Sequence, residues 1–163
     1  MKSQQTIKET RMVRLIDDEG LRIPCLEVNQ NDSNINECIE DLLQGMKLFK
    51  GCGLAANQIG YQKQICVIDF APLQPLILIN PVITKSKGTA TENEGCLSLP
   101  GMQVPVTRAK EITVKYDNRY FKPCTIKLSG FRARKVQHEL DHILHGKLIT
   151  DYIQKGQEVK IKI

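Results

Sequence analysis

The feature that most constrains the fold of this chain is the segment 137–146, Gln-His-Glu-Leu-Asp-His-Ile-Leu-His-Gly, which holds all three histidines. On an α-helix, with about 100° of rotation per residue, His138 and His142 lie within about 40° of each other and about 6 Å apart along the axis. Apolar residues gather on the opposite side, namely Val136, Leu140, Ile143 and Leu144. The pattern predicts a helix over residues 131–145, ended by Gly146, with one buried face and two histidines on the other.

The two histidines and the glutamate beside the first form the sequence His-Glu-x-x-His, which occurs in metal-dependent hydrolases. Two imidazoles at this spacing can bind one metal ion, and Glu139 then lies where its carboxylate meets a water at the metal. The same pattern also arises by chance on charged helices, so a third ligand is the test. His145 is a poor candidate, because ligands at these three positions would spread over about 10 Å of helix.

Two known forms of this motif lack their third ligand here. The metzincin form requires glycine where this chain has His145, and the thermolysin form requires a carboxylate from a later helix, which the remaining sequence does not predict. Cys96 remains, in the segment Glu94-Gly95-Cys96-Leu97-Ser98, where glycine and serine indicate a break between strands. A Cys-His-His set leaves one coordination position open, and its thiolate favours a redox-active ion such as Fe(II).

The remaining helix and strand signals indicate an α+β fold. A second helix is predicted where Ile39, Leu42, Leu43 and Met46 recur at helical spacing, ending at Gly51. We expect short strands around Pro24 and over residues 65–68, 76–79 and 158–163, and a hairpin over 111–116 and 124–128. Strands and helices do not alternate in βαβ order. The expected architecture is therefore small antiparallel sheets packed around the central helix that carries the metal motif.

Length and composition limit the class of protein. A chain of 163 residues is expected to form a single catalytic domain over residues 1–163. No apolar stretch approaches the roughly 20 residues that span a bilayer, and the N-terminal residues have no apolar signal core, so we expect a soluble cytoplasmic protein without a membrane partner. The six cysteines are never paired as Cys-x-x-Cys and are expected to be free thiols. A net charge of +5 without tryptophan gives no reason to expect specific nucleic-acid recognition.

Three blocks of residues together give the chain a resemblance to the peptide deformylase family. They are residues 51–58 (Gly-Cys-Gly-Leu-Ala-Ala-Asn-Gln), 94–98 (Glu-Gly-Cys-Leu-Ser) and 137–142 (Gln-His-Glu-Leu-Asp-His), in the family's order and at familiar intervals. The resemblance extends over residues 7–152. It implies a metal-dependent amidase that hydrolyses the N-formyl group from the N-terminal formyl-methionine of newly synthesised polypeptides and releases formate.

The resemblance also implies roles for individual residues. Cys96, His138 and His142 would bind the metal, and Glu139 would take a proton from the attacking water and pass it to the leaving amine. The side chain of Gln58 and the backbone N–H of Leu97 would hold the oxyanion.

Other residues of the three blocks and their surroundings would bind the substrate. Gly53 and the segment around Gly95 would align the peptide backbone as a strand. Leu54 and Phe131 are candidates for an apolar methionine pocket, and each is equally well explained as a core residue. Arg108 would pair with Glu94 or Asp141 behind the site.

The metal, the partner and two alternative functions complete these expectations. Fe(II) is the first choice of metal, and Zn(II), Ni(II) or Co(II) are other possible occupants. The expected partners are N-formyl-methionyl nascent peptides at the ribosome. One alternative is a related amidase with a different acyl preference. The other is a catalytically silent binding module, against which the presence of Glu139 and Gln58 argues, because such a module has no chemical need for either.

Overall fold

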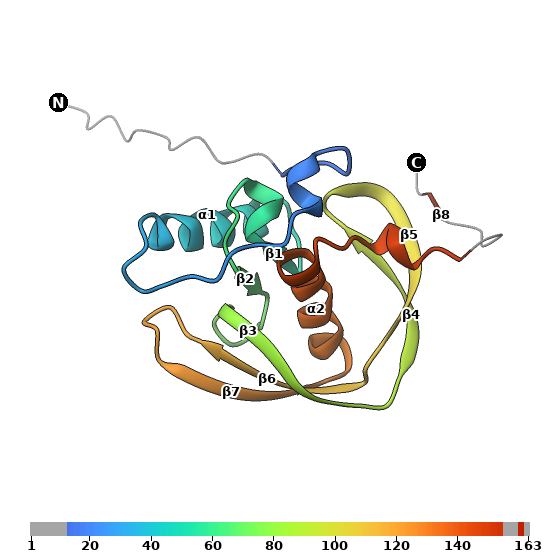
Figure 1. The fold of residues 1–163 in the computed structure, drawn as a ribbon. Coiled ribbons are helices and arrows are strands. Elements are labelled where there is room, and N and C mark those ends of the chain that lie inside the picture. The colour runs from blue at the N-terminus through green and yellow to red at the C-terminus, as the bar shows by residue number, and fades with distance from the viewer. Residues whose placement is uncertain (1–12, 155–159, 162–163) are drawn as a thin grey trace.

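Two antiparallel sheets lie around helix α2 in the computed structural model, which describes residues 13–154 and 160–161 (Figure 1). The strand order is β1-β2-β3-β6-β7 in the larger sheet and β4-β5-β8 in the smaller one. The strands are β1 (Gly53–Ala55), β2 (Ile65–Ile68), β3 (Leu76–Lys87), β4 (Ala90–Cys96), β5 (Leu99–Arg108), β6 (Glu111–Asp117), β7 (Pro123–Ser129) and β8 (Lys160–Ile161). The predicted α+β class, with antiparallel sheets around the motif-bearing helix, is confirmed.

Two α-helices and four short helical segments complete the described part of the chain. The α-helices are α1 (Ile35–Leu48) and α2 (Gly130–Leu140). The short segments are the 3-10 turns η1 (Glu19–Arg22), η2 (Ala56–Ile59) and η4 (Ile149–Tyr152), and the π-helical turn η3 (Asp141–His145), which continues α2. None of the helices in the described residues combines the length and apolar character that crossing a lipid bilayer requires.

Helix α1 covers the larger sheet near β1 and β2. Its apolar residues Ile39, Leu42 and Met46 are buried in one cluster with residues of the two strands, such as Leu54 and Val67. The predicted helix is confirmed, but its end differs from the prediction. The helix ends at Leu48, before the predicted Gly51, and Lys50 after it takes a left-handed conformation with φ 52°.

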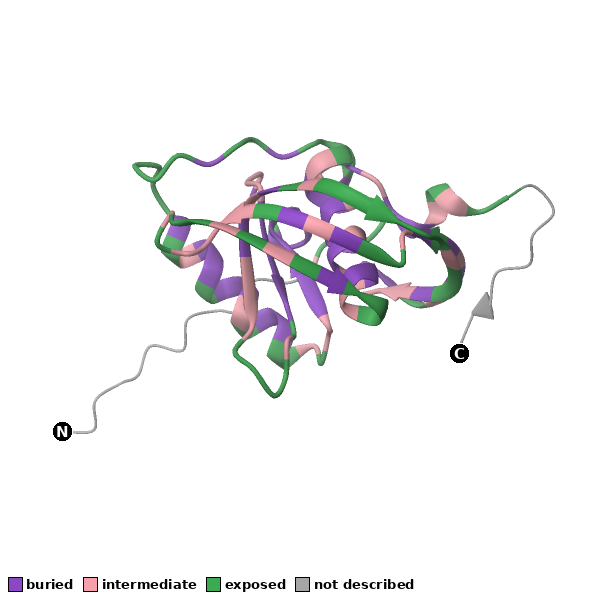
Figure 2. Cartoon of the chain, turned by 90° about the horizontal axis from the view of Figure 1, so that it is seen from below, coloured by how far each residue is buried: buried purple, intermediate pink, exposed green. Residues whose placement is uncertain are grey.

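Helix α2 packs one face against the same sheet, from β1 and β2 to β6 and β7. Val136 and Leu140 are buried in a cluster with Ile112 and Val114 of β6 and Leu128 of β7. Figure 2 shows buried residues gathered in the interior between the elements and exposed residues along the outer strands and loops. Since the apolar face is occupied by the larger sheet, polar residues of α2 can face the smaller sheet, where His138 bonds to Glu94 of β4.

Several predicted strands agree with the structure. Residues 65–68 form β2, and the predicted hairpin is β6–β7, whose strands pair in register from Glu111 opposite Ser129 to Asp117 opposite Pro123. The strand predicted at 76–79 continues through Pro81 to Lys87. A register shift between Ile79 and Val82 makes this possible, because proline has no N–H to donate to the ladder.

Other predictions at the level of elements are wrong or only partly tested. Residues 13–28 contain no strand in the structure; η1 and extended backbone occupy them, joined to the sheet by one isolated bridge between Leu26 and Lys63. The predicted helix 131–145 changes at Asp141 from α to π geometry. Of the predicted tail strand, Lys160–Ile161 form β8, and residues 158–159 and 162–163 lie outside the described part of the chain.

Candidate metal centre and active site

Helix α2 and the π-turn after it supply the two histidines and the glutamate of the motif. His138, Glu139 and His142 are all buried, and the Nε2 atoms of the two histidines lie 3.3 Å apart. A hydrogen bond of 2.8 Å from the Asn57 side chain to the backbone carbonyl of His142 ties the π-turn to η2. Burial lowers the pKa of His142, which therefore stays a neutral imidazole, the form that binds metals.

Cys96, the last residue of β4, brings a thiol to the same point. Its Sγ atom lies 3.5 Å from Nε2 of His142, and the ligand atoms of Cys96, His138 and His142 all lie within 4.8 Å of one another. One thiol and two imidazoles converging on one point form a donor set for a soft or borderline divalent ion. The residues therefore fit a catalytic metal site, since three protein ligands leave one coordination position open.

A buried carboxylate fixes the orientation of His138. Glu94 of β4 accepts a hydrogen bond of 2.9 Å from Nδ1 of His138, which leaves Nε2 of the ring directed at Cys96 and His142. Burial alone would raise the pKa of Glu94, but the hydrogen bonds from His138 and Arg108 hold it at about 2. Glu94 is therefore a permanent anion, the usual partner behind a metal-binding histidine.

Arg108 of β5 connects this carboxylate to the π-turn. Its guanidinium donates two hydrogen bonds to Glu94, of 2.7 and 2.9 Å, and a third of 2.8 Å to Asp141. The sequence left open whether Arg108 pairs with Glu94 or with Asp141, and the structure shows that it binds both. One buried side chain thus links the segments that carry Cys96 and His142.

Glu139 directly follows His138 in α2 and lines the same cavity as the ligand cluster. Its side chain is 2% exposed, and its Oε2 atom has no hydrogen-bond partner among the described residues. Burial raises the pKa of Glu139, against the opposing charges of His138 and Lys135. A carboxylate with a raised pKa and an unused oxygen can accept and return a proton, as a general base and acid must.

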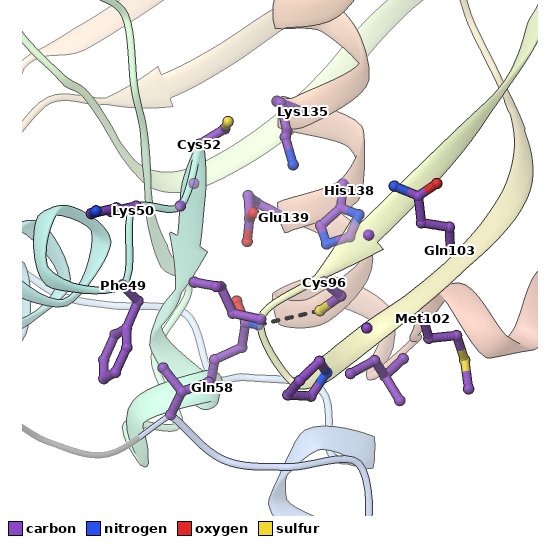
Figure 3. A pocket seen from close by; sticks show the side chains of 18 of the residues that line it. Phe49, Lys50, Cys52, Gln58, Cys96, Met102, Gln103, Lys135, His138 and Glu139 are labelled. Atoms are coloured by element: carbon purple, nitrogen blue, oxygen red, sulfur yellow. Dashed lines mark hydrogen bonds between the residues drawn. The ribbon is translucent and has the colours of Figure 1, made fainter. Parts of the chain in front are cut away.

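The cluster lies at the wall of a cavity of about 630 Å³, which Figure 3 shows from close by. The cavity separates β1 and the end of α1 from the β4–β5 connection. Its lining includes Val13, Leu15, Phe49, Lys50, Gly51, Cys52, Gly53, Gln58, Gly95, Cys96, Leu97, Leu99, Pro100, Gly101, Met102, Gln103, Lys135, His138 and Glu139. A cavity of this size accommodates a few residues of a peptide.

The structure brings most of the substrate and oxyanion candidates to this cavity. Gln58 accepts a hydrogen bond of 3.0 Å from the backbone N–H of Ala55, and its Nε2 lies 3.1 Å from Oγ of Ser98 and 3.5 Å from Sγ of Cys96. Leu97 and Gly95 line the same space. A Cβ atom on Gly53 would lie 2.8 Å from Oε1 of Glu139, so only glycine leaves room for that carboxylate.

Two candidates for the methionine pocket are not among the residues that line this cavity, and their role in binding methionine stays a prediction. Leu54 is fully buried in the core cluster beside α1, because alternate residues of β1 point to opposite sides of the strand. Phe131 is 60% exposed at the start of α2 and does not line the cavity. His145, which the sequence made a poor candidate for a ligand, is exposed and lies outside the cluster.

The apolar lining of the cavity comes instead from residues that the sequence did not single out. Val13 and Leu15 reach it because the backbone N–H groups of Arg14 and Ile16 bond to the carbonyls of Gln58 and Ser98, at 2.6 and 3.1 Å. Phe49 and Met102 complete this lining. Only their position in the sequence could have pointed to Phe49 and Met102 as cavity residues, because Phe49 lies just before the first block and Met102 just after the second.

Comparisons with known proteins agree with this geometry. The chain matches the family model for polypeptide deformylase over residues 10–159. It is 39% identical over 155 residues to the peptide deformylase of Chlorobium phaeobacteroides, covering 91% of this chain and 82% of the relative. The peptide deformylase of Dictyoglomus thermophilum is 39% identical over 141 residues, covering 86% and 91%.

Solved structures give the same result. The crystal structure of a peptide deformylase from Legionella pneumophila matches with a TM-score of 0.84 and 37% identity, covering 88% of this chain and 86% of that one. The peptide deformylase from Thermotoga maritima matches with a TM-score of 0.84 and 36% identity, covering 89% and 98%. The chain therefore belongs to the polypeptide deformylase family, metal-dependent hydrolases whose function is the deformylation of N-formyl-methionine.

Proposed function

We propose that the cavity binds the formylated N-terminus of a polypeptide and that Glu139 moves the proton during hydrolysis of the formyl amide, beside a metal ion held by Cys96, His138 and His142. One observation carries this proposal. Three donor atoms converge within 4.8 Å of one another beside a buried carboxylate oxygen that has no partner in the described residues. A purely structural core would not leave such a carboxylate unsatisfied.

A divalent ion at this site would supply a Lewis acid that makes water a nucleophile at neutral pH and polarises the formyl carbonyl. The chain's own groups perform the remaining tasks. Glu139 accepts the proton of the attacking water at its free Oε2 and later donates it to the leaving amine. The raised pKa of Glu139 supports this exchange, because a carboxyl that titrates closer to neutrality both takes and returns a proton readily.

The negative charge that develops on the formyl oxygen requires donors on the other side of the cluster. We assign this task to the Nε2 group of Gln58 and the backbone N–H of Leu97. The hydrogen bond from the Ala55 N–H to Oε1 of Gln58 supports the assignment, because it fixes the amide with its donor group toward Cys96. A preoriented neutral donor of this kind stabilises the oxyanion without reorganisation.

The peptide backbone would bind between the two sheets. β1 and β4 are edge strands, each the first in its sheet, and Gly53 and Gly95 belong to them. Edge strands offer backbone N–H and C=O groups that an extended peptide can bond to. We therefore infer that residues following the formylated methionine lie along these edges.

The test is formate release from a formyl-Met-Ala-Ser peptide by protein prepared without oxygen and loaded with Fe(II) or Ni(II). We expect metal-dependent release of formate. The matched control is the acetyl-Met-Ala-Ser peptide, and dominant release of acetate would instead identify an amidase with a different acyl preference. Absence of release from both, with metal bound, would identify a silent binding module.

We propose Fe(II) as the native metal, with Zn(II), Ni(II) and Co(II) as alternative occupants. The thiolate ligand supports the choice, since sulfur favours borderline, redox-active ions. Elemental analysis of protein purified under nitrogen should find iron, and turnover should fall on exposure to air. Zinc in that preparation, with stable turnover in air, would overturn the assignment.

We further propose that the chain acts as a single catalytic domain on nascent polypeptides at the ribosome in the cytoplasm. The family function supports this setting, because formyl-methionine is present when synthesis begins. Co-sedimentation with ribosomes that carry nascent chains tests the association. Recovery only in the unbound fraction would mean that the protein acts after release of the chain.

A further inference from the structure

The outer face of the larger sheet carries lysines that the reaction does not use. Residues paired across β3, β6 and β7 turn their side chains to the same side of the sheet and therefore form rows. Three of these rows are Val82–Lys115–Thr125, Lys85–Thr113–Lys127 and Lys87–Glu111–Ser129. Between them along β6, Ile112 and Val114 are buried in the cluster that contains α2, so the three rows face away from that helix.

The lysines of these rows have no acidic partner in the part of the chain that the structure describes. All four are exposed, namely Lys85, Lys87, Lys115 and Lys127. The acidic residues of β6 are Glu111, which is opposite Lys87 in the register without forming an ion pair, and Asp117 at the end of the strand. The ammonium groups are therefore available to an anionic partner.

The charge of the chain is unevenly divided. Residues 82–89 and 110–129, which include this face and its turns, contain seven lysines and arginines and only two acidic residues. Residues 13–41, which lead into α1 and form its first half, contain eight acidic residues and two arginines. In Figure 1 α1 lies in the upper part of the molecule, and β6 and β7 form its lower border. Such a molecule turns its basic side toward a polyanion as it approaches.

The outer face is hollowed over the lysines. A depression of about 540 Å³ is lined by residues that include Lys85, Lys87 and Lys127, and another of the same size by residues that include Lys115. With strands about 4.8 Å apart and alternate residues about 6.8 Å apart along a strand, the Cα atoms of Lys85, Lys87 and Lys127 lie within about 12 Å of one another. A single carboxylate cannot meet charges spread in this way, whereas successive phosphates of a nucleic acid can.

We propose that this face binds the phosphate backbone of RNA without reading its sequence. The lysines neutralise phosphates, and the hydroxyl groups of Thr113, Thr125 and Ser129 between them bond to phosphate oxygens and to the ribose 2′-hydroxyl. The three rows contain no aromatic side chain on which a base could stack, so the contact is confined to the backbone. Val82 is their one apolar side chain, which is too little to insert into a membrane.

The inference goes beyond the reaction at the metal centre. It gives the proposed association with ribosomes a surface, and in that respect alone it rests on the proposed function. None of the described residues that line the cavity belongs to β3, β6 or β7. A chain that is bound to RNA through this face therefore keeps its cavity open to a peptide.

The test is fluorescence anisotropy of the metal-loaded protein with a labelled RNA duplex of about 16 base pairs, which presents many successive phosphates. We expect a Kd in the micromolar range at low salt. The logarithm of the binding constant should fall against the logarithm of the salt concentration with a slope of about −3 to −4, as for four phosphate contacts. Absence of binding at low salt would overturn the inference.

Two competing probes separate RNA from other anionic partners. Vesicles of phosphatidylserine and phosphatidylcholine represent a membrane surface, and poly-glutamate represents an acidic protein. We expect neither to displace the RNA at an equal concentration of negative charge. Displacement by either probe would mean that the face does not select RNA and would overturn the inference.

Variants of the central row assign the binding to this face. Lys85→Gln combined with Lys127→Gln should weaken binding about tenfold at low salt and make the slope shallower by about 2, whereas arginine at both positions should keep both values. The matched control is Lys47→Gln combined with Lys63→Gln, which changes the net charge equally outside the face. Equal weakening by the two glutamine pairs would show that only net charge matters, and the inference would be wrong. Far-UV circular dichroism checks that each variant is folded.

The inference and the proposed function fail in different ways. Formate release without RNA binding would overturn the inference and leave the reaction intact. RNA binding without formate release would support the inference and refute the reaction. RNA binding without co-sedimentation with ribosomes would support the inference and refute only the proposed ribosomal setting.

Discussion

Two buried glutamates lie in the same site with opposite protonation tendencies. Glu94 is held ionised by hydrogen bonds from Arg108 and His138, whereas burial raises the pKa of Glu139, which keeps an oxygen free. A pair of carboxyl groups whose surroundings push their pKa values apart is typical of divided roles, here orientation and proton transfer. The motif singled out Glu139, for which we propose proton transfer. The partners of Glu94, namely Arg108, Arg134 and His138, lie 14, 40 and 44 residues away, and no spacing rule connects them.

The first prediction concerns the proton carrier. Glu139→Gln keeps the shape of the side chain and removes its ability to accept a proton, so kcat should fall by about 10²–10⁴-fold. Metal content, measured by elemental analysis, should stay at the wild-type level. Loss of the metal in this variant would mean that Glu139 is a ligand and that its proposed role is wrong.

The second prediction concerns the thiol ligand. Cys96→Ser replaces a thiolate with a poor ligand for soft ions, so affinity for Fe(II) should fall while the fold is retained. Competition with a chromogenic chelator measures the change, and far-UV circular dichroism checks the fold. Cys124→Ser is the control, because Cys124 lies in β7, away from the cluster. If the affinity of Cys96→Ser for Fe(II) is unchanged, Cys96 is not the third metal ligand.

The third prediction concerns the residue that joins the two ligand-bearing segments. Arg108→Met would leave Glu94 and Asp141 without their shared partner, so affinity for the metal should fall by about 10–100-fold, as for other groups behind metal ligands. Chelator competition again provides the measurement. Arg119→Met, which removes only an exposed ion pair with Glu40, should have no effect on affinity. Equal metal affinity of the two variants would contradict the role of Arg108 in joining the two ligand-bearing segments.

Among the secondary-structure elements, the sequence predicted the strands in which the order of apolar and polar residues follows the order of buried and exposed positions. Residues 65–68 are buried throughout, and β6 alternates around Ile112 and Val114, so both carry a clear signal. β4 has one buried side chain, Glu94, and therefore no apolar pattern to detect. The π-turn was also missed, because Asp141–His145 differ from the preceding helix in hydrogen-bond register and not in composition.

The fourth prediction concerns the glycine that ends the π-turn. Gly146 has φ 57°, and a Cβ atom there would clash with the backbone of Arg22. Gly146→Ala should destabilise the protein by about 3 kcal/mol or more, since strain and overpacking add. Gly130→Ala is the matched control, because Gly130 has φ 61° with no atom nearby and should cost about 1–2 kcal/mol. Urea denaturation measures the free energy of unfolding of both variants. Equal losses of stability would show that the structure relaxes to remove the clash at residue 146.

At the scale of the whole molecule, the donor set joins parts of the chain that the sequence separates. Cys96 belongs to the smaller sheet and the histidines to the segment packed on the larger one, and Cys96 and His138 are 42 positions apart in the sequence. The family resemblance predicted this meeting. The cavity walls could not be predicted in the same way, because Val13 and Leu15 reach them through two backbone hydrogen bonds that have no side-chain signature.

The fifth prediction follows from this arrangement. A metal that binds only the folded chain stabilises it by about 2.7 kcal/mol at 100 times its dissociation constant. Removing it with a chelator should therefore lower Tm by about 5–10 °C for a chain of this size. Calorimetric scans with and without chelator provide the measurement, with His138→Ala as a control that should respond less. An unchanged Tm in the wild type would show that the ligand atoms are held in place without the metal.

The π-turn also has a consequence for how this region can change in evolution. Its length is fixed at both ends, since His142 must reach Cys96 and Gly146 must pass beneath the carbonyl of Arg22. Removing or adding one residue between them would rotate one end away from its contact. The turn at Gly88, by comparison, is exposed. Lineages derived from this chain should accumulate insertions and deletions at such surface turns and keep a constant number of residues from 141 to 146.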